Sequence, residues 1–290
     1  MTRAGAGRFA PSPTGHLHLG SLLAATASYL DARSQGMAWQ VRLDDLDEPR
    51  SEPGADRAIL QALECHGLYW DGPVIRQSDH GERYAAALDA LAAAGHLFYC
   101  RCSRKDLRDA AIYPGTCREH RSPRPDCAIR VRVGEATVEF DDLLLGPQRV
   151  VLARDTGDFV VRRRDGLTAY QLATAVDDGD PAITRVIRGR DLLDSTPRQI
   201  YLMRQLGLSI PRYGHIRVLL NAHGQKLSKS TRAAALDLSR PADNVARVLS
   251  LLGHTAPPDE ADPHAMLTRA APDFELQRIP REDAVVAAAS

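Results

Sequence analysis

Two short segments, about 200 residues apart, carry the residue types best suited to chemistry on a phosphate. In the first, the Pro- and Gly-rich stretch 11–15 leads into an amphipathic pattern that begins near residue 21. A turn that leads into a helix exposes the first backbone N–H groups of that helix, and these can bind an anion. The second segment, residues 226–230, places two lysines on a short polar loop. Either segment alone is common, but together they predict a nucleotide site.

The elements that would position these segments alternate in the manner of a parallel sheet covered by helices. Short apolar runs predict strands at 7–10, 38–43, 183–187 and 214–220. Helical patterns at 21–34, 55–65 and 81–94 are each followed closely by a glycine, which is typical of a helix C-terminus. The sequence therefore predicts an α/β fold.

The composition of the chain limits the class of protein to which it can belong. The chain has 290 residues and 44% hydrophobic residues, enough for two or three domains. Its 37 basic and 37 acidic residues cancel, so an RNA partner would need a local patch. We find no apolar leader and no membrane-spanning run, which predicts a cytoplasmic protein without a membrane partner. The five cysteines favour metal or core roles over disulfides.

The pattern changes between about residues 97 and 165, where cysteines, arginines and short strand-like runs replace the helical periods. We expect this insertion to have its own core and to split the nucleotide-binding domain. The predicted segments are 1–96 (first half), 97–165 (insertion), 166–235 (second half, with the lysine loop) and 236–290 (short and helical). About 60 residues follow the lysine loop, too few for another large helical domain, and we expect a frayed tail over 285–290.

The insertion contains a candidate metal site. Cys100, Cys102 and Cys117 offer three thiolates, which are preferred zinc ligands. Tyr113 could complete a closed tetrahedral site, and so could Cys127 or His120. Residue types alone do not decide which of these is the fourth ligand. They also allow the alternative that the three cysteines bind no metal. Arginines surround this region and predict an RNA-facing surface. They are Arg101, Arg104, Arg108, Arg118, Arg121, Arg124, Arg130 and Arg132.

Several motifs resemble those of class I aminoacyl-tRNA synthetases. His18-Leu19-Gly20-Ser21 is similar to the family's HIGH motif, and Lys226-Leu227-Ser228-Lys229-Ser230 to its KMSKS motif. The stretches 8–12, 42–47, 170–173 and 186–189 resemble the glutamyl branch, in order over residues 8 to about 230. The stretch 188–199 is most similar to the glutamyl-queuosine tRNA(Asp) synthetases, truncated relatives that lack the anticodon-binding domain.

The resemblance implies a Rossmann-type parallel sheet, split by a zinc-containing subdomain, in an ATP-dependent ligase. L-glutamate and ATP, with Mg²⁺, would form glutamyl-adenylate without tRNA. Glutamate would then pass to queuosine at the wobble position of tRNA(Asp), recognised through its anticodon arm. The family ligands of one structural Zn²⁺ correspond to Cys100, Cys102, Tyr113 and Cys117. A short glutamyl-tRNA synthetase that charges the 3′ end of tRNA(Glu) is the alternative, and a glutamate- or ATP-sensing binding module is the third reading.

Glutamate presents two carboxylates and one ammonium group, and a selective site must pair each of them. The residues expected to contact it are Arg8, Ala10, Ser12, Asp44, Tyr170 and Arg188. Arg8 and Arg188 would clamp carboxylates through bidentate guanidinium contacts. Asp44 would pair with the ammonium group. The family usually carries Glu at this position, so the side chain here is one methylene shorter.

The phosphates of ATP are expected at the start of the first helix. The residues expected to contact ATP are His18, Gly20, Lys226 and Lys229. His18 would stabilise charge that develops at the α-phosphate, and Lys229 would hold the phosphates from the loop, so these two are the predicted catalytic residues. His16 is expected to be an ordinary turn residue. We expect the protein to be a monomer.

Overall fold

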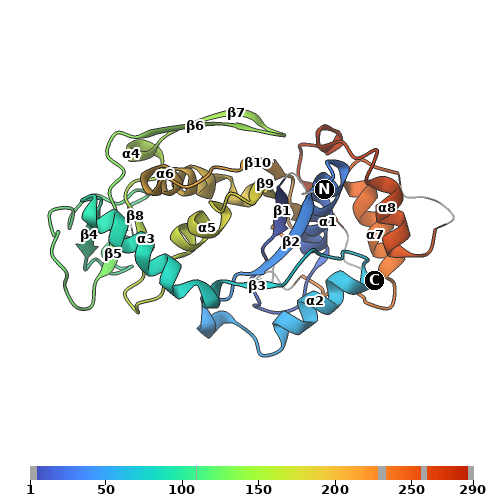
Figure 1. The fold of residues 1–290 in the computed structure, drawn as a ribbon, viewed down its shortest axis with the longest axis horizontal. Helices are drawn as coiled ribbons and strands as arrows, with labels where there is room; N and C mark the ends of the chain where they lie inside the picture. Colours follow the sequence, from blue (N-terminus) through green and yellow to red (C-terminus); the bar gives the residue numbers. More distant parts are fainter. Residues whose placement is uncertain (1–4, 109, 228–232, 256–259, 287–290) are drawn as a thin grey trace.

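The computed structural model describes residues 5–108, 110–227, 233–255 and 260–286, and a five-stranded parallel sheet lies at its centre (Figure 1). The strand order is β10-β9-β1-β2-β3. The strands are β1 (Ala6–Phe9), β2 (Ala38–Leu43), β3 (Ile75–Arg76), β9 (Ile183–Gly189) and β10 (Arg212–Ile216). Strands β2 and β3 lie on one side of β1, and the later strands β9 and β10 lie on its other side, so the strand order reverses between β1 and β9. In such sheets, ligands bind beyond the carboxyl ends of the strands at that reversal. The predicted α/β fold is confirmed.

Hydrophobic side chains form two large clusters, one against each face of this sheet, because successive strand residues point to opposite faces. The first cluster contains side chains of α1 (Leu19–Ser34), α2 (Ala55–Cys65), α7 (Pro241–Leu251) and α8 (Pro263–Ala270). The second contains side chains of α3 (Gly81–Ala93), α5 (Tyr170–Asp178) and α6 (Thr196–Leu206). Neighbouring β9 residues show the alternation, since Val186 joins the second cluster and Ile187 the first.

The insertion forms antiparallel structure beside the central sheet. Its elements are β4 (Leu97–Cys100), β5 (Ala128–Val131), β6 (Thr137–Asp142), β7 (Gly146–Val151), α4 (Leu152–Asp155) and β8 (Phe159–Arg162). Strands β4, β5 and β8 make one small sheet, and β6 and β7 make a hairpin that lies along α6 (Figure 1). Val131 and Phe159 pack in the same hydrophobic cluster as Ile200 of α6. The strands of the insertion therefore share a core with the helices, and only the small cluster of Phe98, Cys100, Tyr113 and Cys117 is separate from it, so the expectation of a separate core holds only for that part.

The apolar run 214–220, predicted as one strand, is divided. Strand β10 ends at Ile216, and β11 (Leu219–Leu220) pairs with β12 (Ala284–Val285) instead of with the central sheet. The run is apolar on both sides of the break because both parts are buried, so hydrophobicity alone does not reveal it. Val286 is also buried, so the predicted fraying is wrong at 285–286, and residues 287–290 lie outside the described part.

The C-terminal segment packs against α1 beside the central sheet. Val245, Val248 and Leu249 of α7 are buried in the cluster that contains α1, which confirms the predicted helical period. The short 3-10 helices are η1 (Glu48–Arg50), η2 (Gln77–His80), η3 (Arg190–Ser195) and η4 (Leu276–Arg278). Among the described helices, none combines the length and the apolar character needed to span a bilayer.

Candidate functional site

A cavity of about 400 Å³ opens at the carboxyl ends of β1, β9 and β10, where the strand order reverses. Nine predicted site residues line it: Arg8, Ala10, Ser12, His18, Gly20, Asp44, Tyr170, Arg188 and Lys226. Lys229 lies outside the described residues. Because parallel strands end at the same edge, segments that are more than a hundred residues apart in sequence meet here. His16 is exposed and does not line this cavity, as expected of a turn residue.

Arg188 is buried near the end of β9, and other side chains engage two of its three guanidinium nitrogens. Its Nε donates to Nε2 of His215 at 3.2 Å, and its Nη2 donates to Thr196 at 2.7 Å and to Gln199 at 2.8 Å. Its Nη1 is buried and has no hydrogen-bond partner among the residues that the structure describes. An unpaired buried donor of a charged group is costly, so this nitrogen is suited to an anionic ligand in the cavity.

Arg8 and Asp44 belong to a buried ion network. Arg8 binds Asp178 with both Nε (3.0 Å) and Nη2 (2.6 Å). Arg42 bridges the two carboxylates, donating to Asp178 at 2.6 Å and to Asp44 at 2.7 Å. The bidentate edge of Arg8 is thus occupied, and only Nη1 is not engaged by Asp178. The carboxylate of Asp44 can still accept further hydrogen bonds, because two oxygens offer about four sites.

The network shifts the protonation equilibria of its carboxyl groups. Burial by itself would raise the pKa of Asp178, but the charges of Arg8 and Arg42 outweigh it and hold this pKa well below the usual range. Burial raises the pKa of Asp44 above its ordinary value, and Arg42 opposes this shift. An added cation beside Asp44 would favour its charged form further, which suits an ammonium ligand.

His18 is the N-cap of α1, and its Nδ1 accepts a hydrogen bond from the backbone N–H of Ser21 at 3.2 Å. Because Nδ1 is an acceptor, the ring proton of the neutral imidazole is on Nε2, which can donate to a ligand. A Cβ atom at Gly20 would lie 3.1 Å from Cε1 of His18, so glycine makes room for this ring. The helix dipole adds positive potential at the same place.

Lys226 also lines this cavity and pairs with Asp191 at 2.5 Å. Its side chain is nearly half exposed, so the pair is screened by water and is easily exchanged for another anion. The cavity therefore combines a cationic wall, a helix N-terminus and an unpaired guanidinium nitrogen.

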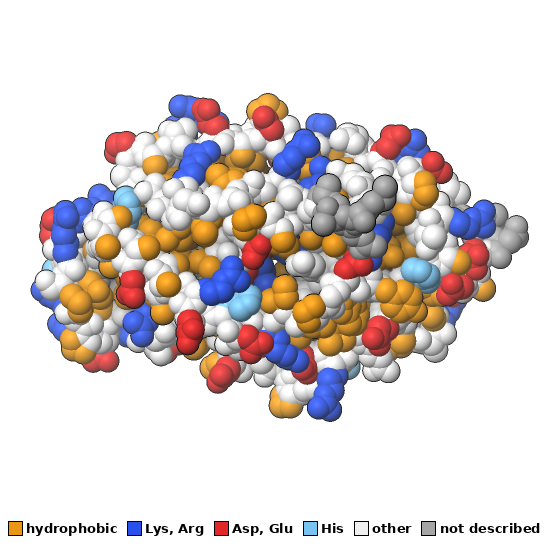
Figure 2. Space-filling model, viewed as in Figure 1, with side chains coloured by type: hydrophobic (Ala, Val, Ile, Leu, Met, Phe, Trp, Pro, Cys, Tyr) orange, Lys and Arg blue, Asp and Glu red, His pale blue; other side chains and the backbone are white. Residues whose placement is uncertain are grey.

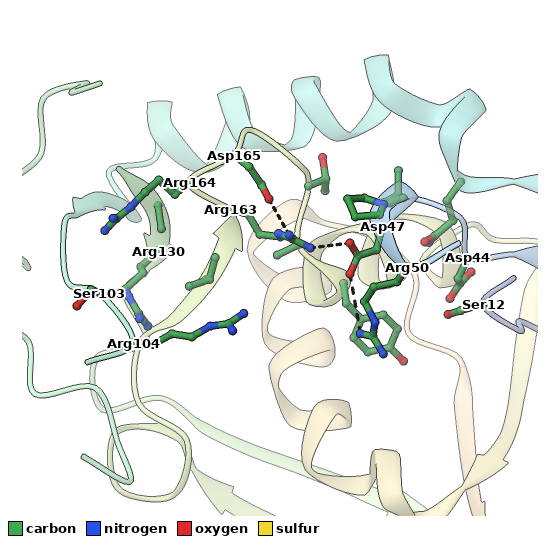
Figure 3. A pocket seen from close by; sticks show the side chains of 18 of the residues that line it. Ser12, Asp44, Asp47, Arg50, Ser103, Arg104, Arg130, Arg163, Arg164 and Asp165 are labelled. Atoms are coloured by element: carbon green, nitrogen blue, oxygen red, sulfur yellow. Dashed lines mark hydrogen bonds and ion pairs between the residues drawn. The ribbon is translucent and has the colours of Figure 1, made fainter. Parts of the chain in front are cut away.

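A second, larger cavity of about 1310 Å³ adjoins the first, and Ser12, Asp44 and Tyr170 line both (Figure 3). Tyr170 is 39% exposed at the start of α5. The larger cavity extends to Cys102 of the insertion. Its lining arginines are Arg50, Arg104, Arg130, Arg163 and Arg164. In Figure 3, Asp47 lies between Arg163, at 3.1 Å, and Arg50, at 3.9 Å.

Of the eight arginines predicted to face RNA, only Arg104 and Arg130 line this cavity. Arg118 is held by the buried carboxylate of Asp158 at 2.7 Å, and Arg132 bonds the backbone of Arg118. On the face drawn in Figure 2, basic and acidic side chains are interspersed. The lining of the larger cavity also includes Asp44, Asp47 and Asp165, and Arg163 pairs with the last two of these.

The thiols of the insertion converge. The sulfurs of Cys100, Cys102 and Cys117 lie within 4.8 Å of one another, and no other such group of His, Cys, Asp or Glu exists among the described residues. The Cys102 and Cys117 sulfurs are 3.7 Å apart, and the Tyr113 hydroxyl oxygen lies 3.4 Å from Cys100 Sγ and 4.0 Å from Cys102 Sγ. Zn–S bonds of about 2.3 Å in a tetrahedron place sulfurs roughly 3.8 Å apart. The cluster could hold a metal, and neither Cys127 nor His120 belongs to it.

Sequence reasoning missed the residues that hold the predicted ones. Asp178 ends α5, and His215 lies within β10, both fully buried. The signal for Asp178 was a pair of aspartates that closes an otherwise apolar helix, since a buried carboxylate needs a cationic partner. His215 interrupts an apolar strand, which gives a similar but weaker signal.

The sheet, the cavity at its reversal and the capped helix define a class I synthetase catalytic core, and comparison with known proteins agrees. The family model of the class I (E and Q) tRNA synthetase catalytic domain matches residues 6–123 and 111–243. A glutamate tRNA ligase from Elizabethkingia meningosepticum superposes with a TM-score of 0.81 at 24% identity, over 98% of this chain and 67% of that one. This likeness concerns the fold alone.

Curated relatives show to which family of class I synthetases the chain belongs. The glutamyl-Q tRNA(Asp) synthetase of Pseudomonas paraeruginosa is 49% identical over 97% of both chains. The protein of the same name from Thiobacillus denitrificans is 49% identical over 96% of both. The chain therefore belongs to the glutamyl-Q tRNA(Asp) synthetase family of ligases.

Proposed function

We propose that the smaller cavity joins L-glutamate to ATP, with Mg²⁺, to form glutamyl-adenylate and pyrophosphate. A glutamate carboxylate oxygen attacks the α-phosphorus, and pyrophosphate leaves with the electron pair of the broken P–O bond. His18 and the N-terminus of α1 stabilise the charge on the phosphate, and Lys226 with Lys229 holds the leaving group. The observation that carries the proposal is that Arg188 lines this cavity while its buried Nη1 has no hydrogen-bond partner among the described residues, because such a donor favours an anionic ligand nearby.

We assign Arg188 to the side-chain carboxylate of glutamate. Asp44 is assigned to the ammonium group, together with the hydroxyl groups of Ser12 and Tyr170. Arg8 contributes at most its Nη1 and otherwise holds Asp178 in place. Glutamine would present a neutral amide to Arg188 and leave the guanidinium charge unmatched, so the site should reject it. Ala10 also lines the cavity, where its small side chain leaves room for the ligand.

In the second step, we propose, a hydroxyl oxygen of queuosine at the wobble position of tRNA(Asp) attacks the activated carbonyl carbon. AMP leaves, the hydroxyl proton is released, and an ester remains on the base. The names of relatives that align over 97% of both chains support this acceptor. The adjoining cavity, with five arginines, supplies a place for the anticodon arm. Charging of the 3′ end of tRNA(Glu) is the alternative acceptor.

Glutamate activation should not require RNA, because the described residues that line the glutamate site already meet in one cavity of the isolated chain. We expect exchange of labelled pyrophosphate into ATP when glutamate is present and RNA is absent. Glutamine in place of glutamate should lower kcat/KM by roughly 100-fold or more. Exchange that appears only after tRNA is added would contradict RNA-independent activation, and no exchange under either condition would contradict the proposed reaction.

We propose that Cys100, Cys102, Tyr113 and Cys117 bind one structural zinc ion. Four protein ligands fill the tetrahedron, so the metal would stabilise the insertion and leave no open position for chemistry. Metal analysis should find about one zinc per chain. Cys117→Ser should lose it and unfold roughly 5 °C lower or more, whereas Cys65→Ser, outside the cluster, should retain it. Full zinc retention in Tyr113→Phe would remove the tyrosine from the ligand set.

A further inference from the structure

A buried carboxylate and imidazole connect the β6–β7 hairpin of the insertion to the glutamate site. Asp142 ends β6 and His215 lies in β10, and both side chains are 0% exposed. Oδ2 of Asp142 lies 2.6 Å from Nδ1 of His215. An ionised carboxylate can only accept a hydrogen bond, so the imidazole proton is on Nδ1.

This assignment leaves the Nε2 lone pair of His215 facing the donors around Arg188. Nε2 lies 3.2 Å from Nε of Arg188 and 2.9 Å from the hydroxyl of Thr196. Burial lowers the pKa of His215, against the opposing effect of Asp142, and so favours the neutral ring. A protonated ring would place a second N–H against the Nε–H of Arg188, and two donors would face each other. The ring must therefore be neutral, with its proton on Nδ1.

We propose that Asp142 and His215 are positioning residues that select glutamate by fixing Arg188. The carboxylate sets the tautomer of the imidazole, the imidazole holds Nε of Arg188, and Thr196 with Gln199 holds Nη2. Nη1 is then the one nitrogen left for a substrate carboxylate. The inference rests on the proposed function, in which Arg188 binds glutamate, and it gives the inserted hairpin a part in amino-acid selection.

The two oxygens of Asp142 have separate partners, which permits a sharp test. Oδ1 accepts the backbone N–H groups of Leu144 and Leu145, both at 2.9 Å, and that of His215 at 3.3 Å. Within the described part of the chain, Oδ2 bonds only the His215 ring. Asp142→Asn can keep the Oδ1 contacts and the fold while it presents an N–H donor to Nδ1. The ring proton must then move to Nε2, where it opposes the Nε–H of Arg188.

We expect Asp142→Asn to raise the KM for glutamate at least tenfold in RNA-free pyrophosphate exchange, to leave the KM for ATP within twofold, and to lower glutamate-over-glutamine selectivity. Glu139→Gln is the matched control, because it removes the same charge from the same strand at an exposed pair with Arg149. This control should match the wild type. Nitrogen-15 NMR of the imidazole should report an Nδ1–H tautomer for His215 in the wild type and an Nε2–H tautomer in Asp142→Asn.

An unchanged glutamate KM in a folded Asp142→Asn protein would overturn the proposal, as would an Nε2–H tautomer in the wild type. Should Asp142→Asn not fold, Thr196→Val removes an acceptor of Arg188 and a donor to His215, and the same rise in glutamate KM is expected. An unchanged glutamate KM in that variant would equally overturn it. If the wild type shows no glutamate-dependent exchange, the proposed function fails. The tautomer measurement still decides whether Asp142 sets the tautomer of His215.

Discussion

Replacing Arg188 with alanine is expected to raise the KM for glutamate by roughly 30-fold to several thousand-fold. The reason is that loss of a buried, hydrogen-bonded charge partner costs about 2–5 kcal/mol, and about 1.4 kcal/mol corresponds to a factor of ten. The guanidinium is buried, lines the cavity, and has one nitrogen without a hydrogen-bond partner among the described residues. The KM for ATP should change little, because the proposed ATP contacts are made by other residues of the cavity, His18, Gly20 and Lys226.

Arg190→Ala is the matched control for this variant. Arg190 lies two residues further along the chain, has a side chain that is 40% exposed, and pairs with Asp283 at 3.2 Å. It does not line the cavity, so its loss should leave the KM for glutamate unchanged. Steady-state pyrophosphate exchange at varied glutamate measures both variants. Equal glutamate KM values for Arg188→Ala and the wild type would exclude Arg188 from substrate binding.

Asp178→Ala should have the largest effect on stability. It leaves Arg8 and Arg42 buried without the carboxylate they share, and breaking a buried ion pair from one side costs about 3–5 kcal/mol. Urea denaturation should show this loss in the free energy of unfolding. Asp180→Ala is the control, because Asp180 is 45% exposed and its nearest cation, Arg83, is 3.8 Å away. A loss below about 1 kcal/mol in Asp178→Ala would show that the network does not stabilise the fold.

The sign of the pH dependence follows from the direction of the Asp178 shift. The folded pKa is depressed, so the contribution of this carboxylate is complete above the unfolded value of about 3.9. It is lost as the pH falls below about 4 toward the folded pKa. The wild type should therefore lose stability more steeply than Asp178→Ala in that acidic range.

The residues that line the cavity were easier to predict than the residues that hold them in place. Arg8, His18 and Arg188 occur in short motifs, and a parallel sheet necessarily brings the ends of its strands together. The pairing of Arg8 with Asp178 spans 170 residues, and it depends on where the end of α5 lies relative to the central sheet. Local sequence contains no information about that packing. For the same reason, nothing in the motif around Arg188 indicated its contact with His215.

The fold shows a similar division. Strand β2 and helix α2 occur at the predicted residues, because each is bounded by clear turn signals. The break after Ile216 was missed, since the chain remains buried when it leaves the sheet. The core that the insertion shares with the helices was also missed. The apolar character of residues such as Phe159 predicts that they are buried, but not which helix they contact.

The most direct test of the proposed function is the destination of the glutamyl group. Labelled glutamate and ATP should be incubated with two anticodon stem-loops of tRNA(Asp), one with queuosine and one with guanosine at the wobble position, and with full-length tRNA(Glu). Mass spectrometry of the released nucleosides then locates the ester. We predict glutamyl-queuosine from the first stem-loop, nothing from the second, and no label on the 3′ adenosine of tRNA(Glu). Label on that adenosine, with none on the queuosine stem-loop, would contradict the account.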